Sequence, residues 1–499
     1  MQLVELLMNI VYICVQGNVY MEVNDIAYDS RKVKTDSVFV CIPGMERDGH
    51  DYAGQAAAKG CAVIVAEHQV PIDETITLII VEDTREALAS MSAAFFGYPS
   101  KRLKTIGITG TKGKTTIAYM IKSILDRAGI KTGLIGTIET IIGEQLIGSY
   151  NTTPESYNIQ KYLYQMAEAG CKCVVMEVSS QGLKHKRVWG IEFDYGVISN
   201  IAPDHIGKNE HESFEEYMQC KSLLFEQSKL GIVNRDDANV TKALKAVRCP
   251  IIYFGRDRKS HLWAEQIHAK RFTDNLGVSF EVKGLWEFKT EVHMPGIFNV
   301  ENALIAIAVC KHFNISAETI NEALKSIRVK GRVQILPGTD GYTVMIDYAH
   351  NAASLKKLLE TLKSYAPRRL ICVFGCGGNR SKMRRYEMGE VSGTLADLSI
   401  VTSDNPRFES PMDIINDIMI GILKGKRDFL VIENRKEAIK YAIRNAHKGD
   451  IIVFAGKGHE TYQEIKGKRY DYNEEQLIID EIAASKSYER FLPEAKDVS

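Results

Sequence analysis

The amino-acid sequence predicts an α/β protein with three domains, on three observations. At 499 residues the chain has the length of about three domains, at roughly 150 residues each. From residue 99 onward, apolar runs alternate with helical patterns, which is typical of a parallel sheet covered by helices on both faces. After about residue 330 a second series of the same kind begins. We therefore expect domains at 1–98, 99–330 and 331–499.

Residues 1–98 predict short strands and helices. The segments "SVFVCIPG" and "CAVIVAE" are expected as strands, and the stretch from near His50 to Gly60 as a helix that a glycine ends. The first residues, "MQLVELLMNIVYICVQGN", are apolar but lack a basic start and a small-residue cleavage site. They are also interrupted by Glu5, so we expect a core helix and strand rather than a signal peptide.

The two later domains each carry their own series of apolar strands. In the second, a turn at Pro99 leads into the strands "TIGITG", "CKCVVMEVSS", "FDYGVISN" and "KLGIVN". The segment "VKGRVQILPG", residues 329–338, has the turn and charge features of a linker. Five more strands follow in "YTVMIDYAH", "RRLICVFGCGG", "LSIVTSDNP", "DFLVIE" and "DIIVFAGKG", and the last residues, "FLPEAKDVS", are expected to be a loose tail.

Composition excludes several classes of partner. Lys plus Arg and Asp plus Glu both number 63, so no global field recruits nucleic acid or an anionic membrane, and local clusters must meet any anionic substrate. The ten cysteines are scattered without a paired zinc pattern, which indicates buried free thiols in a reducing cytosol. No stretch approaches the ~18 apolar residues of a membrane helix. We expect a cytoplasmic protein without membrane insertion.

The stretch "GITGTKGKTT" indicates a phosphate-binding loop. It departs from the strict pattern G-x-x-x-x-G-K-[ST], because Ile108 stands where the first glycine belongs. Its context is nevertheless strand, glycine loop and amphipathic helix, in which backbone N–H groups and the helix start converge on phosphate. Lys114 can reach the outer phosphates, and the Thr115 hydroxyl can ligate Mg²⁺. A plain strand-to-helix turn is the alternative, and it leaves this glycine and lysine pattern unexplained.

Polar side chains follow two neighbouring strands, where ligands of an open α/β sheet bind. Glu177 stands at the end of "CVVMEVSS", and "SNIAPDHIGKNEH" supplies Asn200, Asp204, His205 and His211 after the next strand. Mg²⁺ takes one or two carboxylates together with substrate oxygens. The alternatives are a structural glutamate at a strand end and histidines on the surface.

These motifs together resemble the Mur ligases, the ATP-dependent amide ligases of peptidoglycan synthesis. The phosphate loop of that family reads T-G-T-x-G-K-T-T, which Thr109 to Thr116 match. The resemblance covers nearly the whole chain, through "NTTP", "MEVSSQGL", "VNRDD", "PGIFNVENA", "DYAHN", "FGCGGNR", "DNPR" and "AGKGHETYQ". It implies that ATP is held by Gly110, Thr111, Lys112, Gly113, Lys114, Thr115, Thr116, Asn299, Arg332 and Asp347.

The pair "DNPR" and "GKGHE" is similar to the branch of the family that adds the third residue of the stem peptide. The resemblance implies that an amino acid is joined to UDP-MurNAc-L-Ala-D-Glu through an acyl phosphate, while ATP becomes ADP and phosphate. It also implies an N-terminal domain for the UDP-sugar, a central ATPase with a parallel sheet and a C-terminal Rossmann-like domain for the amino acid. We expect a monomer that acts on these small molecules.

The same resemblance assigns the chemistry to particular residues. It implies catalytic roles for Lys114, Glu177, Asn200, His205 and Lys221, the last of these carbamylated by CO₂. It places one Mg²⁺ on Thr115 and Glu177 and a second on Glu177 and His205, beside the modified Lys221. The strongly anionic UDP-sugar peptide is expected to bind Ser30, Asn151, Thr152, Thr153, Ser179, His185 and Arg187.

The amino acid is expected to be meso-diaminopimelate. Its distal carboxylate suits the planar guanidinium of Arg407 in "DNPR", which relatives that add lysine usually lack. The set implied for this substrate is Arg385, Asp404, Asn405, Pro406, Arg407, Gly456 and Glu460. The chain departs from the usual family pattern at Gln181, Gln334, Ala352 and Asn379, and the loop around His211 is two residues longer.

Three alternatives remain at this stage. The same reaction with L-lysine or another amino acid is the first. A folylpolyglutamate-synthetase-like ligase shares the chemistry but is not expected to carry "DNPR" with "GKGHE". A non-catalytic nucleotide-binding protein or P-loop motor is the third, and the presence of Lys114, Thr115, Glu177 and His205 argues against it.

Overall fold

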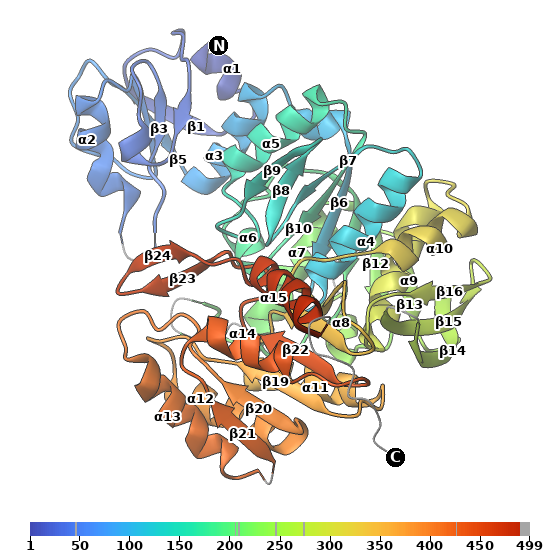
Figure 1. Cartoon of the computed structure of the whole chain (residues 1–499). Coiled ribbons are helices and arrows are strands. Elements are labelled where there is room, and N and C mark those ends of the chain that lie inside the picture. The colour runs from blue at the N-terminus through green and yellow to red at the C-terminus, as the bar shows by residue number, and fades with distance from the viewer. Residues whose placement is uncertain are drawn as a thin grey trace, which may run out of the picture. The chain divides into compact units, whose positions relative to one another are not determined.

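The structure is a computed structural model that describes residues 1–44, 47–204, 206–207, 210–244, 247–272, 275–425 and 427–489. It has two compact units. The first comprises Met1–Trp263, Lys283–Trp286 and Asn302–Ile320, and the second comprises Ala264–Val282, Glu287–Glu301 and Asn321–Ser499. The mixed α/β class with parallel sheets is confirmed (Figure 1). The domain boundaries at residues 98 and 330 stay predictions.

The N-terminal part of the first unit is a sheet with strand order β1-β5-β4-β3-β2. Its side chains alternate, so that one face packs on α1 and α3 and the other on α2. The elements are α1 (Leu3–Leu6), β1 (Tyr12–Gln16), β2 (Ile26–Ala27), η1 (Ser30–Lys32), β3 (Val38–Val40), η2 (Gly49–Tyr52), α2 (Ala53–Ala58), β4 (Val63–Ala66), β5 (Thr77–Val81), α3 (Thr84–Phe95) and η3 (Pro99–Arg102).

Two expectations for this region need correction. The helix expected from His50 to Gly60 is a 3-10 turn, η2, followed by the short α2. The first strand was expected in the core, but β1 is an edge strand that pairs antiparallel with β5 alone, and Ile13 is 68% exposed. Cys14 on this strand is therefore an exposed thiol, unlike the buried cysteines that the sequence predicts.

The second sheet has eleven strands, and the part of it within the first unit runs in the order β13-β12-β11-β6-β10-β7-β8-β9 (Figure 1). Strands β13 to β7 are parallel, and β8 and β9 form an antiparallel hairpin after β7. The elements are β6 (Lys104–Thr109), α4 (Lys114–Arg127), β7 (Thr132–Ile135), β8 (Glu139–Ile142), β9 (Gln145–Gly148), α5 (Ser156–Glu168), β10 (Cys173–Glu177), α6 (Ser180–Lys184), β11 (Phe193–Ile198), α7 (Phe214–Glu226), β12 (Ser228–Asn234), α8 (Ala238–Ala243) and β13 (Ile251–Gly255).

The register of this sheet determines where the site lies. Strand β6 is central, with β10 and β11 parallel on its two sides, so Glu177 pairs with Ile108 and Ile198 pairs with Thr109. The carboxyl ends of all three strands therefore lie at one edge of the sheet. This brings the glycine loop after β6, the end of β10 and Asn200 after β11 together, as the sequence predicts.

The three remaining strands of this sheet and the two helices after them are divided between the units. They are β14 (Leu262–Arg271), β15 (Leu276–Gly284), β16 (Phe288–Val292), α9 (Phe298–Lys311) and α10 (Ala317–Ser326). Strands β15 and β16 are antiparallel, with side chains that alternate between buried and accessible positions.

The sheet of the second unit has the order β17-β18-β22-β19-β20-β21 and is parallel except for β17. The segment expected as a linker thus contains an edge strand, because Gln334–Leu336 pairs antiparallel with β18. The elements are β17 (Gln334–Leu336), β18 (Thr343–Asp347), α11 (Ala352–Lys363), β19 (Leu370–Phe374), α12 (Lys382–Leu395), β20 (Leu398–Val401), α13 (Pro411–Ile422), β21 (Asp428–Val431), α14 (Arg435–Arg444), β22 (Ile451–Ala455), β23 (Tyr462–Ile465), β24 (Lys468–Asp471) and α15 (Glu474–Glu489).

Alternate side chains of these strands enter two separate cores. Along β19, Cys372 and Phe374 pack against α11, α12 and α13, while Ile371 and Val373 pack against α14 and α15. The five strands expected in this region are therefore confirmed as a sheet covered on both faces. The expected tail, residues 491–499, lies outside the described residues. Of the helices in the described ranges, none combines the length and apolar character that a bilayer crossing needs.

Candidate functional site

The glycine loop joins β6 to α4 in a conformation that requires glycine. Gly110 has a φ of +138°, and a Cβ atom there would lie 2.0 Å from Ser199 Oγ. Gly113, at φ +93°, directly precedes the helix that starts at Lys114. The chain therefore enters α4 with the backbone N–H groups of the first helical turn at the end of the loop, the arrangement that binds phosphate.

The end of β11 holds this loop in place. Asn200 Oδ1 accepts from Lys112 N at 2.9 Å, and Asn200 Nδ2 donates to Lys112 O at 3.0 Å. The hydroxyl of Ser199 also donates to Lys112 O at 2.8 Å. Asn200 was expected among the catalytic residues, and its contacts with the loop are those of a residue that positions the backbone. Thr111 Oγ1 lies 3.0 Å from Tyr217 OH, a contact that no sequence pattern indicates.

Two lysines meet at one carbonyl oxygen of the loop. Lys114 Nζ donates to Gly110 O at 2.8 Å, and Lys221 Nζ reaches the same atom from α7 at 3.0 Å. The Lys221 side chain is 1% exposed, and its ammonium also lies 4.4 Å from the centre of the Tyr217 ring. Burial, reinforced by the charge of Lys114, holds the pKa of Lys221 well below its ordinary value. Both effects act against the charged form of this amine.

Glu177 lies behind the loop, fully buried at the end of β10. Its Oε2 accepts from the hydroxyls of Thr115 and Thr137, both at 2.9 Å, and its Oε1 accepts from Thr137 N at 2.9 Å. One carboxylate with two hydroxyls is a set of hard oxygen donors, which fits Mg²⁺. Thr137 was not expected, since it follows β7 in a turn without a recognisable pattern. His205, expected as a metal ligand, lies outside the described residues.

Several residues expected to hold the UDP-sugar peptide are linked to Glu177 by hydrogen bonds. The Thr137 hydroxyl lies 3.0 Å from that of Thr152, and Thr153 Oγ1 donates to Glu177 O at 3.0 Å. Ser179 N donates to Thr153 Oγ1 at 2.9 Å, and Arg187 Nη1 donates to Thr153 O at 3.0 Å. The structure therefore brings Thr152, Thr153, Ser179 and Arg187 together beside the phosphate loop.

The other expected residues of this group differ in their surroundings. Burial lowers the pKa of His185 to about 4, and the nearby charges of Arg85 and Arg187 lower it further. Arg187 pairs with Glu155 at 2.8 Å. Asn151 is exposed, and Ser30, in the N-terminal sheet region, donates to Gln55 Oε1 at 2.7 Å. Arg85 also lies 3.7 Å from Glu155, so the two arginines share one carboxylate of the protein.

In the second unit a buried lysine connects the two motifs "DNPR" and "GKGHE". Lys457 is fully buried, donates to Asn405 Oδ1 at 2.7 Å and lies 3.2 Å from Asp404 Oδ1. Glu460 Oε2 accepts from Asn405 Nδ2 at 2.9 Å, and burial raises the pKa of Glu460. Asp404, Asn405 and Glu460 are thus one network, and Lys457 is a member that the sequence did not single out.

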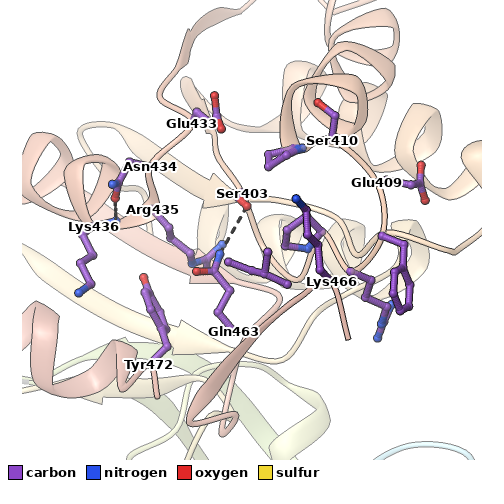
Figure 2. A pocket seen from close by; sticks show the side chains of 15 residues that line it. Ser403, Glu409, Ser410, Glu433, Asn434, Arg435, Lys436, Gln463, Lys466 and Tyr472 are labelled. Carbon is purple, nitrogen blue, oxygen red and sulfur yellow. Dashed lines mark hydrogen bonds between the residues drawn. The ribbon is translucent and has the colours of Figure 1, made fainter. Parts of the chain in front are cut away.

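Both arginines expected for amino-acid binding already contact carboxylates. Arg407, at a φ of +52°, pairs with Glu464 at 3.2 Å and donates to Gly378 O at 2.7 Å. Arg385 is buried between Asp417 at 2.9 Å and Glu409 at 2.7 Å. Pro406 and Arg407 line a cavity of about 770 Å³, shown in Figure 2, together with Ser403, Phe408, Glu409, Ser410, Pro411, Glu433, Asn434, Arg435, Lys436, Gln463, Ile465, Lys466 and Tyr472.

The remaining residues expected at ATP also belong to the second unit. Asn299 Nδ2 donates to Pro295 O at 2.9 Å. The Arg332 guanidinium lies 5.0 Å from the centre of the Tyr348 ring. Asp347 accepts from Val333 N and Ala349 N, both at 2.8 Å, and burial raises its pKa. Gly456, expected at the amino acid, has a φ of +108° after β22.

Three Mur ligase family models match the chain. They are the Mur ligase family catalytic domain at residues 22–96, the Mur ligase middle domain at 108–310 and the Mur ligase glutamate ligase domain at 331–458. UDP-N-acetylmuramoyl-L-alanyl-D-glutamate–2,6-diaminopimelate ligases are among the similar proteins. The one from Clostridium perfringens is 41% identical over 96% of this chain and 99% of its own length, and the one from Bacillus licheniformis is 39% identical over 91% and 94%.

Solved structures are similar over comparable lengths. A structure of a UDP-N-acetylmuramoyl-L-alanyl-D-glutamate–2,6-diaminopimelate ligase matches with a TM-score of 0.72 and 27% identity, over 99% of this chain and all of that one. A folylpolyglutamate synthase from Thermotoga maritima matches with a TM-score of 0.57 and 19% identity, over 74% of this chain and 90% of that one. The second likeness shows a shared fold and no more.

Proposed function

The chain belongs to the Mur ligase family, and from this premise we propose that it joins meso-diaminopimelate to UDP-N-acetylmuramoyl-L-alanyl-D-glutamate at the expense of ATP. The observation that carries the proposal is the pairing of two sites in one chain. One is a phosphate loop with a buried carboxylate behind it, and the other is the network of "DNPR" with "GKGHE". Relatives that carry this ligase's name match nearly the full length.

The first half of the reaction must activate a carboxylate. A carboxylate oxygen of the D-glutamate attacks the γ-phosphorus of ATP, ADP leaves, and an acyl phosphate forms. Two anions approach each other in this step, so positive charge and backbone N–H groups must be in place beforehand. Lys114 and the start of α4 supply both. Thr115 and Glu177, with Thr137, would hold Mg²⁺, which screens the phosphate charge when bound.

Lys221 suits the modification implied by the family resemblance. Carbamylation joins a neutral amine to CO₂ and releases one proton, so it needs a lysine that is not protonated. The buried Nζ of Lys221, with its lowered pKa, meets that need. The product carries a negative carboxylate-like group, which would lie close to the Lys114 ammonium, since both lysines reach the Gly110 carbonyl oxygen.

In the second half the amine of diaminopimelate attacks the acyl carbon, phosphate leaves, and the nitrogen loses a proton. The guanidinium of Arg407 is the proposed partner of the distal carboxylate, with Asp404, Asn405 and Glu460 beside it to receive an ammonium group. L-Lysine lacks the distal carboxylate and would leave this guanidinium without its ligand. We also propose that the protein acts in the cytoplasm as a monomer.

The test is release of ADP from ATP in reactions that lack one component at a time. The proposal predicts turnover only with Mg²⁺, the UDP-linked dipeptide and diaminopimelate together. ADP release that needs folate and glutamate would instead support a folylpolyglutamate-synthetase-like enzyme. Hydrolysis that is indifferent to all acceptors would support a P-loop protein of another kind.

A further inference from the structure

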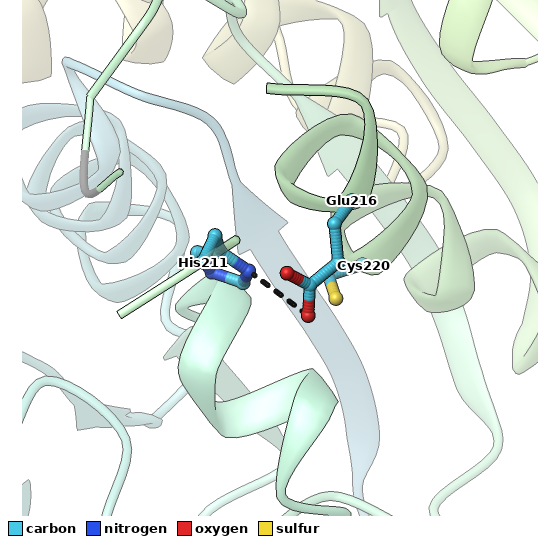
Figure 3. Close-up of side chains that lie close together, drawn as sticks. All are labelled: His211, Glu216 and Cys220. Carbon is cyan, nitrogen blue, oxygen red and sulfur yellow. Dashed lines mark ion pairs between the residues drawn. The ribbon is translucent and has the colours of Figure 1, made fainter. Parts of the chain in front are cut away.

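Three metal-ligand side chains meet at the start of α7, outside the residues that the reaction uses. They are His211, Glu216 and Cys220, and their ligand atoms all lie within 4.8 Å of one another. Figure 3 shows the imidazole of His211 facing the carboxylate of Glu216, with the sulfur of Cys220 beside that carboxylate. Among the described residues, no other group of three His, Cys, Asp or Glu side chains has its ligand atoms this close together.

The local sequence explains the convergence. Helix α7 begins after Ser213, whose hydroxyl accepts from Glu216 N at 3.1 Å. Glu216 and Cys220 are four residues apart and so lie on one face of the helix. His211 precedes the helix, and its ring packs edge-on against Tyr217 with centroids 5.2 Å apart. The loop and the first turns of the helix therefore present all three groups to one point.

The imidazole of His211 is buried with half of its bonding capacity unused. Its Nε2 lies 2.9 Å from Ser180 Oγ, and its Nδ1 has no hydrogen-bond partner among the described residues. Glu216 Oε1 is 3.7 Å from Nδ1, too far for a hydrogen bond. When Nε2 donates to Ser180, the lone pair of Nδ1 faces the carboxylate and the thiol. Buried polar atoms usually have a hydrogen-bond partner, and a bound metal ion would explain why His211 Nδ1 has none.

We propose that His211 Nδ1, the Glu216 carboxylate and Cys220 Sγ form a site for a divalent transition-metal cation of the zinc class. Imidazole, carboxylate and thiolate are all zinc ligands, and three protein ligands with one water complete a tetrahedron. Zinc bonds of about 2.0–2.3 Å place neighbouring ligand atoms roughly 3.3–3.8 Å apart, so side-chain shifts of about 1 Å close the site. On binding, the thiol releases its proton to solvent and the sulfur takes the metal in its place.

Lys184 competes with the cation for this site. Its Nζ lies 2.6 Å from Glu216 Oε1, the same oxygen that faces His211. The Lys184 side chain is 31% exposed, so it can turn into solvent when a cation takes over the carboxylate. Removal of this lysine should therefore strengthen metal binding, which a purely structural cluster does not predict.

The position of the cluster gives it a route to the reaction. Cys220 directly precedes Lys221, whose Nζ contacts the phosphate loop. His211 is bonded to Ser180 of α6, the helix that follows Glu177 and Ser179. A cation here would join α6 to α7 and restrain the backbone that carries Lys221. The set is distinct from the oxygen donors around Glu177, which suit Mg²⁺.

Co²⁺ is the probe for this site, since cobalt bound to a thiolate gives a charge-transfer absorption that oxygen ligands do not. The full-length protein is titrated with Co²⁺ in excess Mg²⁺, which occupies the oxygen site. We expect one equivalent of Co²⁺ with this absorption and its displacement by one equivalent of Zn²⁺. Cys220→Ala should lose the absorption and weaken Co²⁺ binding at least about 100-fold. Loss of a residue that only hydrogen-bonds to a metal ligand already lowers metal affinity about 10–100-fold. Lys184→Gln should bind several-fold more tightly.

The controls are the other accessible thiols. Cys14→Ser and Cys249→Ser should keep the absorption, since Cys14 is exposed, Cys249 is half-buried and neither belongs to the cluster. Alanine is well tolerated in a helix, and circular dichroism with a thermal melt checks that Cys220→Ala folds. His211→Gln should weaken binding while the thiolate absorption persists at high Co²⁺. The proposal is overturned if the absorption never appears, survives in Cys220→Ala, or disappears in Cys14→Ser.

Discussion

The phosphate loop of the first unit and the "DNPR" network of the second unit arrange positive charge in opposite ways. At the loop, Lys114 and Lys221 converge on one backbone carbonyl oxygen. In the second unit, in and around this network, Arg385, Arg407 and Lys457 each contact a carboxylate of the protein. The first arrangement places two lysine nitrogens on a backbone oxygen at the start of α4, where a phosphate is expected to bind. The second must exchange or share an existing ion pair when a substrate carboxylate binds.

The difference in charge arrangement follows from the ligands expected at the two sites, ATP at the loop and an amino acid in the second unit. A nucleoside triphosphate carries enough negative charge to bind several cations and backbone N–H groups at once. The glycine loop determines where those N–H groups lie. A zwitterionic amino acid brings one charge of each sign to each end, and its site must be nearly neutral to bind both. Catalytic power should therefore depend on the loop, and selectivity should depend on the network. Substitutions in the loop and in the second unit test that division.

Lys114→Ala should have the largest effect and should affect chemistry alone. The lysine neutralises charge that develops between ATP and the acceptor, so we expect ligation to fall by about 10³-fold or more. Its side chain contributes little to the core, so the thermal melt should be close to that of the wild type. Near-normal turnover in the folded variant would show that another group carries the charge.

Glu474→Gln tests whether the second unit depends on its buried pairs for stability. Arg435 and Glu474 lie 2.5 Å apart with each side chain 1% exposed, and Glu474 holds the pKa of Arg435 above its ordinary value. The change leaves a buried cation without its counter-charge and should cost about 3–5 kcal/mol of unfolding free energy. Glu437→Gln, which breaks an exposed pair with Lys440, is the control and should cost about 0–1 kcal/mol. Equal losses in urea denaturation would contradict the distinction.

Arg407→Ala should reduce selectivity more than catalysis. Loss of a guanidinium that grips the distal carboxylate should raise KM for diaminopimelate about 10–100-fold, a cost of roughly 1.4–2.8 kcal/mol, and change kcat less. Formation of the acyl phosphate should survive. Glu464→Gln is the matched variant, because it releases Arg407 from its ion pair and should lower KM several-fold. A uniform loss with every amino acid would mean that Arg407 only braces its turn.

Lys221→Met should change stability less than Glu474→Gln and with the opposite sign. The buried lysine has a lowered pKa, so the unfolded chain binds the extra proton and wild-type stability falls as pH falls below the unfolded value of about 10.4. Methionine removes this cost. In CO₂-free buffer at pH 7 we expect a gain of about 0.5–2 kcal/mol that shrinks as pH rises, with ligase activity nearly lost. A destabilised variant would show that the amine is needed for the fold.

Much of this architecture could be predicted from sequence because local patterns determine it. The apolar runs that alternate with helical patterns around β6 and β19 predict the two parallel sheets. The glycine pattern predicts where Lys114 and Thr115 lie. Thr137, Tyr217 and Lys457 could not be found in this way, since each reaches its partner from a segment distant in sequence. The exposure of β1 was also missed, because an apolar edge strand and an apolar core strand have the same composition.

The sequence also left the protonation and pairing of the charged groups open. Whether Lys221 is an exposed helical lysine or a buried amine depends on the strand against which α7 packs, which spacing alone does not reveal. The same holds for the pairs of Arg385 and Arg407, whose carboxylate partners lie on other elements. His205 and the reaction's metal ligands after β11 remain predictions.

The proposed function depends most on the identity of the amino acid that this ligase adds. It is tested most directly by a single reaction that offers ATP, the UDP-linked dipeptide and equal concentrations of meso-diaminopimelate and L-lysine. The masses of the UDP-linked products are then measured. We expect a product that carries diaminopimelate, with lysine incorporated at a level lower by orders of magnitude. Equal incorporation of both amino acids, or a product that carries lysine alone, would contradict it.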